Sequence, residues 1–195
     1  MEAHETTDLV WTMTDVPFLI FNNVFRTQIA PEQLDARIDA ALARAKSRNV
    51  PMSLWVGPTT VRIDIGAYLE NKGFIRADDP PGMAVDLLSL NFDSPMPPDM
   101  VVEEVNDAET LVTWCQISSE VFRFPHFAID AWAGIFASVP FGPGKAHRHY
   151  LSRLVGVPVG TSSVYYGAGV ANVSSVARCP SSGERASAAQ LLLNP

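Results

Sequence analysis

The stretch RHYLSRLVGVPVGTSSVYYGAGVANVSSVARCP, residues 148–180, decides the fold class. It contains three runs of mostly β-branched, aromatic and small polar residues, at roughly 149–155, 158–166 and 169–177. Short glycine-containing turns, GVP and GAG, separate the runs, and this spacing is typical of β-hairpins. The stretch therefore predicts three adjacent antiparallel strands, with a break in pairing near 167–169.

The rest of the chain predicts helices mixed with further strands. A proline-rich polar break, NFDSPMPPDM at 91–100, separates two patterned regions. The first region is predicted to alternate strands and helices, at 17–25, 30–51, 52–58, 64–74 and 82–90. The second is predicted to hold a strand at 100–105 and, after a helix cap at Asn106 or Asp107, helices at 108–122 and 128–139. This order indicates an α/β fold (an α+β mixed sheet).

The composition limits the classes of partner. The 195 residues include 47% hydrophobic residues, which is enough for a buried core. The formal charge of -7 opposes binding to nucleic acid or to acidic membrane surfaces. The acidic N-terminus does not resemble a signal peptide, and no apolar run reaches the roughly 20 residues of a membrane span. Two isolated cysteines, Cys115 and Cys179, favour reduced thiols, so we expect a cytoplasmic protein without a membrane segment.

A strand, two helices, a three-stranded meander and a glycine-containing turn before a helix resemble the GNAT superfamily of acetyl-CoA-dependent N-acyltransferases. The resemblance covers about 100–190 and rests on G-x-P-V, G-T-S, G-A-G and V-A-x-x-P within 148–180. It implies a GNAT-like fold, with acetyl-CoA as the co-substrate. GNAT domains continue beyond the next helix with a strand, a helix and a hairpin, so the fold is expected to be incomplete at the C-terminus.

The resemblance also implies where acetyl-CoA would bind. The main chain of Val176 and Arg178 would hold the pantetheine arm, and a strand N–H would stabilise the oxyanion. The following turn would cradle the pyrophosphate at a helix N-terminus. Its residues are Gly183, Glu184, Arg185, Ala186, Ser187 and Ala188. Counted from Pro180, the family pattern R/Q-x-x-G-x-G/A falls on Gly183, Ala186 and Ala188, and only Ala188 matches it.

The N-terminal region is interpreted as a partial copy of the same fold. A helix ending L-E-N-K-G-F at 69–74 and a run M-A-V-D-L at 83–87 resemble the closing elements of a GNAT domain. The domain interpretation is therefore an N-terminal α/β region over 1–92 and a GNAT-like domain over 99–195. The N-terminal region either completes the GNAT-like domain, with 52–56 beside 170–178 in one sheet, or packs beside that domain. A homodimer is the other way to cover the edge of the strand at 170–178.

The residues expected to contact substrate lie at the end of the helix predicted over 108–122. In the superfamily this region borders the acceptor groove, so Glu120, Phe122, Phe124 and His126 are the candidates, with ordinary core packing as the alternative for the two phenylalanines. No catalytic base can be assigned from the sequence.

Other reactive side chains are expected to be structural. Cys115 lies on an apolar helical face and is expected to be buried. His147 and His149 are two residues apart, as a metal pair would be, but the interpretation is a solvated strand end, and no metal site is expected. Glu103 and Glu104 are expected to be an exposed pair.

Three functions remain open at this point. The first is direct acetyl transfer from acetyl-CoA to the primary amine of a small molecule or protein. The second is a catalytically inactive relative that acts as a binding or interaction module. The third is a two-domain α/β protein with another ligand, because a fold does not determine a function.

Overall fold

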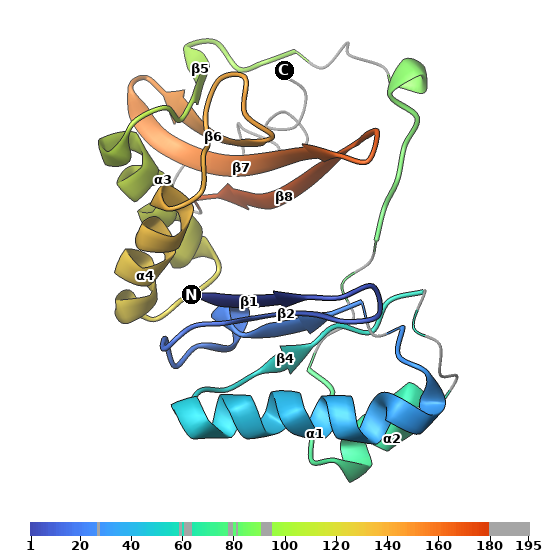
Figure 1. Ribbon diagram of the computed structural model, residues 1–195. Coiled ribbons are helices and arrows are strands. Elements are labelled where there is room, and N and C mark those ends of the chain that lie inside the picture. The colour runs from blue at the N-terminus through green and yellow to red at the C-terminus, as the bar shows by residue number, and fades with distance from the viewer. Residues whose placement is uncertain are drawn as a thin grey trace. The chain divides into compact units, whose positions relative to one another are not determined.

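A computed structural model describes residues 1–26, 28–58, 60, 64–77, 80, 82–90 and 95–179. The chain divides into two compact units, Met1–Ala84 and Val85–Pro195. Each unit has its own four-stranded sheet (Figure 1). In the described ranges, no helix combines the length and the apolar character that a membrane span requires.

The sheet of the N-terminal unit has the order β1-β2-β3-β4. Its strands are β1 (Glu2–Glu5), β2 (Val10–Met13), β3 (Asn23–Phe25) and β4 (Ser53–Leu54). The first three are antiparallel neighbours, whereas β3 and β4 are parallel. Because parallel neighbours need a crossover, helix α1 (Pro31–Arg48) joins β3 to β4, and a short helix α2 (Ile65–Asn71) follows.

Helix α1 forms where its sequence pattern predicts it. Pro31 takes the first helical position, where its missing N–H costs nothing, and Asn49 ends the helix in the left-handed region with φ 54°. One face is buried against the sheet, and its buried residues are Leu34, Ile38, Ala41 and Ala45. Figure 1 shows the helix running along one face of the sheet.

The C-terminal unit has a fully antiparallel sheet with the order β5-β6-β7-β8. Its strands are β5 (Met100–Glu104), β6 (His147–Leu154), β7 (Val157–Gly167) and β8 (Val170–Arg178). Helices α3 (Ala108–Val121) and α4 (His126–Ala137) lie between β5 and β6 in the chain. The predicted meander is confirmed, and Ala168 and Gly169, with φ 51° and 76°, form its second turn.

Helix α3 covers the sheet of this unit and contacts β6, β7 and β8. It begins at Asp107, whose Oδ1 accepts the N–H of Thr110 at 2.8 Å, so one of the two predicted caps is confirmed. Trp114 is fully buried and donates its indole N–H to the carbonyl of Ser162 on β7 at 3.1 Å. These contacts fix α3 at both its start and its centre.

Three predictions about the N-terminal region are wrong. The strand expected at 17–25 is reduced to Asn23–Phe25, after a 3-10 turn η1 at Leu19–Phe21, and the hairpin of β1 and β2 was not predicted. The strand expected at 82–90 is absent from its described residues, which hold a 3-10 turn η2 at Leu87–Ser89. The side chains of Met83 and Leu88 are more than 90% exposed, so these apolar residues do not pack against a neighbouring strand.

The third error concerns the edge of the meander. The alternative in which 52–56 lies beside 170–178 in one sheet is wrong, because β4 pairs with β3 in the sheet of the N-terminal unit. The interpretation of this unit as a partial GNAT-like copy stays a proposal.

Candidate functional site

Strand β8 carries a bulge in its second half. Ser163 pairs with Ser174, whereas Thr161 pairs with Ala177, so β8 uses two residues where β7 uses one. A bulge bends its strand and redirects the main chain locally. Among the described residues β7 is the strand that pairs with β8, so the other edge of β8 faces away from the sheet.

Ser175 and Val176 are the two residues of this bulge. Ser175 has φ 51°, in the left-handed region that non-glycine residues seldom adopt. Such strain persists only where surrounding contacts hold it, and here a side chain of β7 does so.

Two buried hydroxyls hold the bulge from the side of α3. Thr161 donates its hydroxyl proton to the carbonyl of Ser175 at 3.2 Å. The oxygens of Ser118 and Thr161 are 2.8 Å apart. Because a hydroxyl has one proton and that of Thr161 is engaged, Ser118 is the donor in this second bond. The hydrogen bonds therefore run from α3 through β7 to the strained residue of β8.

The predicted acetyl-CoA residues fall partly within this strand. Val176 lies in the bulge, and Arg178 is the last residue of β8. Cys179 donates its N–H to the carbonyl of Val159 at 2.9 Å, and the alternation of an antiparallel ladder then directs the main-chain groups of Arg178 away from β7. The six predicted residues of the pyrophosphate turn, 183–188, lie outside the described residues.

A pocket of about 640 Å³ lies between the end of α3 and the start of α4. It is lined by Gln116, Ser119, Glu120, Arg123, Phe124, His126 and Ile129. Three of the four residues expected to contact substrate, Glu120, Phe124 and His126, are thus brought together. The fourth, Phe122, is not part of the lining and stacks on Phe124 with ring centroids 5.9 Å apart.

The connection between α3 and α4 is a tight helix end. Phe124 donates its N–H to the carbonyl of Ser119 at 2.8 Å, and Arg123 donates its N–H to Glu120 at 3.2 Å. These two bonds define a Schellman motif, in which Arg123 takes the left-handed position with φ 56°. Glycine is the usual residue there, so an arginine at this position carries backbone strain.

The pocket mixes charged and apolar groups. The side chains of Gln116, Glu120, Arg123 and His126 are exposed, while Phe124 and Ile129 provide apolar surface. Ser119 is 1% exposed, and its Oγ has no hydrogen-bond partner in the described part of the chain. The pocket can therefore accept a ligand that carries both polar and apolar groups.

Glu120 also influences the end of β8. Burial, and then the negative charge of Glu120, raise the pKa of the Cys179 thiol. Cys115 is fully buried as expected, and burial raises the pKa of its thiol to about 12. Neither cysteine is a nucleophile at neutral pH, because the thiolate is the reactive form.

The prediction of a solvated strand end at His147 and His149 is wrong. His149 is fully buried, its Nδ1 lies 2.7 Å from the hydroxyl of Ser163, and its Nε2 has no partner among the described residues. Burial, and then the charge of His147, lower the pKa of His149 to about 3. His147 is half-buried, and burial lowers its pKa as well. No group of three or more potential metal ligands occurs within the described residues.

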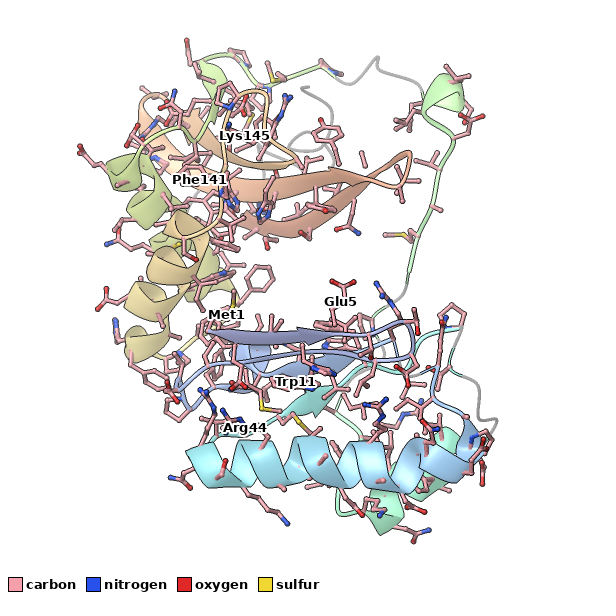
Figure 2. All side chains as sticks on the ribbon, viewed as in Figure 1. Met1, Glu5, Trp11, Arg44, Phe141 and Lys145 are labelled. Atoms are coloured by element: carbon pink, nitrogen blue, oxygen red, sulfur yellow. The ribbon has the colours of Figure 1, made fainter. Side chains whose placement is uncertain are left out.

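Aromatic rings enclose the buried imidazole. The ring centroid of His149 lies 4.8 Å from that of Trp114, 4.6 Å from that of Phe136 and 5.9 Å from that of Phe141. Phe141 is labelled in Figure 2. This environment explains why a neutral imidazole is favoured. The histidine is therefore part of the core between the helices and the sheet.

The expected exposed pair of Glu103 and Glu104 is half-buried instead. Glu103 accepts a hydrogen bond from Arg153 at 2.7 Å, and Glu104 lies 3.9 Å from Arg148. Each carboxylate thus has a cation on the adjacent strand β6. This arrangement suits strand pairing better than proton transfer.

The N-terminal unit has a smaller pocket of about 300 Å³ between its hairpin and α1. Trp11 and Arg44, both labelled in Figure 2, are part of its lining. Arg44 already binds Glu2 at 2.7 Å, and a second lining arginine, Arg37, lies 3.5 Å from Asp8. Because these cations have carboxylate partners, the pocket is a poorer candidate for a ligand.

Sequence reasoning missed Ser119, Arg123 and Thr161. A signal was present for Arg123. Pro125 favours a helix that ends shortly before the proline, and a residue in the left-handed region often follows such an end. Ser119 and Thr161 carry no such signal, because their roles depend on contacts between distant elements.

Comparisons with known proteins agree with this architecture. No family model and no curated protein sequence matches the chain. Among solved structures, a GCN5-related N-acetyltransferase from Kribbella flavida matches 98% of this chain and 73% of its own, with a TM-score of 0.71 and 17% identity. A functionally unknown conserved protein from Staphylococcus epidermidis ATCC 12228 matches 93% of this chain and 73% of its own, with a TM-score of 0.58 and 7% identity. The predicted fold class is thereby confirmed: the chain has the mixed α/β fold of a GCN5-related N-acetyltransferase.

Proposed function

We propose that the chain transfers the acetyl group of acetyl-CoA directly to a primary amine. The observation that carries this proposal is strand β8, which combines a bulge at Ser175 and Val176 with an edge that no strand of the described residues pairs with. The likeness of the fold to an N-acetyltransferase supports it.

The open edge of β8 suits the pantetheine arm. This arm contains two amide groups, which can pair with main-chain groups of Val176 and Arg178 as a neighbouring strand would. A main-chain N–H at the bulge would donate a hydrogen bond to the thioester oxygen as negative charge develops on it. The strand would thus orient the thioester and stabilise the charge.

The pocket between α3 and α4 suits the amine. The carboxylate of Glu120 would attract an ammonium group, and Phe124 and Ile129 would contact its apolar part. The ammonium would first lose a proton to solvent. The neutral amine would then attack the thioester carbon, an N–C bond would form, and the C–S bond would break. The proton that nitrogen loses after the attack would pass to the sulfur, so that CoA leaves as its thiol. Glu120, Phe122, Phe124 and His126 remain the proposed substrate contacts.

The turn at 183–188 is proposed to bind the pyrophosphate through main-chain N–H groups. Ala186→Glu would then abolish acetyl-CoA binding, because it adds bulk and negative charge beside the phosphates. Glu184→Gly would strengthen binding, because it removes a negative charge. If both variants bind acetyl-CoA as the parent does, this turn is not the phosphate site.

Isothermal titration with acetyl-CoA tests the proposal as a whole. Micromolar binding by the parent that Val176→Pro abolishes would support the proposal, because proline has no main-chain N–H to donate. No binding at millimolar acetyl-CoA would favour the inactive relative that acts as a binding module. We further propose a cytoplasmic location, which the two free cysteines support. A homodimer that covers the edge of β8 would exclude the pantetheine arm, so it belongs with the inactive alternative.

A further inference from the structure

The pocket between α3 and α4 contains the N-terminus of a helix. Helix α4 runs for 12 residues from His126, and its N-cap residue, Pro125, provides no side-chain hydrogen bond. The first turn of a helix presents N–H groups and the positive end of the helix dipole. His126 lines the pocket, so this end of α4 adjoins the pocket.

Ser119 gives an independent indication of a ligand. Its side chain is 1% exposed and lines the pocket, yet its Oγ has no hydrogen-bond partner among the described residues. A buried hydroxyl without a partner is costly, and native structures usually satisfy such a group. A ligand oxygen in the pocket would accept its proton.

Arg123 adds a positive charge at a strained position. It lines the pocket and has φ 56°, where glycine would avoid the strain. A planar guanidinium suits carboxylate and phosphate oxygens, which can accept two hydrogen bonds from it. Glu120 is the carboxylate of the lining, and it would repel an anion but attract an ammonium group.

The geometry points to an acceptor that carries both charges. The anionic group, a carboxylate or a phosphate, binds Ser119, Arg123 and the start of α4, while the amine lies toward Glu120. This assignment of a zwitterionic, amino-acid-like substrate class rests on the proposed function for the amine, but the anion subsite itself requires no acetyl transfer.

Matched pairs of small molecules test the anion subsite without acetyl-CoA. One pair is phenylalanine and 2-phenylethylamine, and the other is phosphoethanolamine and ethanolamine. Amide chemical shifts of Ser119 and His126 in ¹⁵N-labelled protein give each dissociation constant. In at least one pair, the anionic member is expected to bind about tenfold tighter than its partner. One charge-assisted hydrogen bond is enough for a tenfold change in the dissociation constant.

Two variants separate binding from folding. Arg123→Gly removes the guanidinium and the strain together, so the unfolding temperature is expected to stay or to rise while the preference for the anionic member falls about tenfold. Ser119→Ala removes a hydroxyl that has no partner within the described ranges, so it too is expected to weaken anion binding without loss of stability. Lys145→Gln, on the loop before β6 (Figure 2), removes a charge elsewhere in the same unit and is the matched control.

The inference is overturned if neither anionic compound binds tighter than its partner, or if Arg123→Gly and Lys145→Gln have equal effects. Titration of the same samples with acetyl-CoA is a separate measurement. A protein that binds the anionic amines but not acetyl-CoA would contradict the proposed function and leave the subsite in place.

Discussion

Acidification should destabilise the C-terminal unit through His149. Burial, followed by the charge of His147, lowers the pKa of this imidazole from 6.5 to about 3 in the folded protein. The unfolded chain therefore binds a proton below pH 6.5 that the folded chain does not bind. The free energy of unfolding therefore has its full value above pH 6.5, and it decreases as the pH falls from 6.5 toward 3. Between pH 7 and pH 5 the expected loss is about 2 kcal/mol.

Urea unfolding measures this loss. Replacing Trp11 and Trp55 by phenylalanine leaves the two tryptophans of the C-terminal unit as the fluorescent reporters. His149→Gln keeps a polar group beside Ser163 but cannot titrate. Between pH 7 and pH 5, the variant should therefore lose about 2 kcal/mol less of its free energy of unfolding than the parent loses.

Ser163→Ala is the matched control. It removes the hydrogen-bond partner of the imidazole and should lower stability at both pH values by about 1–3 kcal/mol, since a buried polar group loses its partner. Because the buried imidazole remains, the pH dependence should persist. Equal losses of stability in the parent and His149→Gln would refute the reasoning.

Further outcomes follow from other contacts. Thr161→Val should loosen the bulge, seen as faster amide hydrogen exchange around Ser175, and should weaken the proposed acetyl-CoA binding. Thr161→Ser keeps the hydroxyl, so both should stay as in the parent. Trp114→Phe should cost about 1–3 kcal/mol in urea unfolding, because the carbonyl of Ser162 loses its indole donor. Ile38→Ala should destabilise the N-terminal unit by about 2–5 kcal/mol, measured by calorimetry, because the side chain is fully buried.

The parts of the fold that could be predicted have local causes. Two glycine-containing turns and the runs between them determine the meander, and each hairpin pairs residues that are close in sequence. Helix α1 was predictable because Leu34, Ile38 and Ala45 recur at helical spacing after Pro31. Such patterns act within a few residues and need no knowledge of distant partners.

The errors arise where distant partners decide. Residues 82–90 have strand composition, but a strand forms only beside another strand, and the sequence does not reveal whether one is present. His149 was expected in solvent because its neighbours Arg148 and His147 are polar, yet Trp114 and Phe136 cover it from the helices. The burial of the Ser119 hydroxyl likewise depends on the turn between α3 and α4. These features are properties of packing rather than of local pattern.

The two short turns of the meander also suggest an order of folding. Hairpins with short loops close quickly, since little chain entropy is lost, so β6, β7 and β8 should associate early. The hydroxyl of Ser118 lies 43 residues before Thr161 in the chain and reaches it only when α3 docks. The bulge of β8 should therefore gain its fixed shape late, and a folding intermediate with a complete meander would still lack an ordered bulge. Pulse-labelling hydrogen exchange would detect it as early protection along β7 and late protection at Val176.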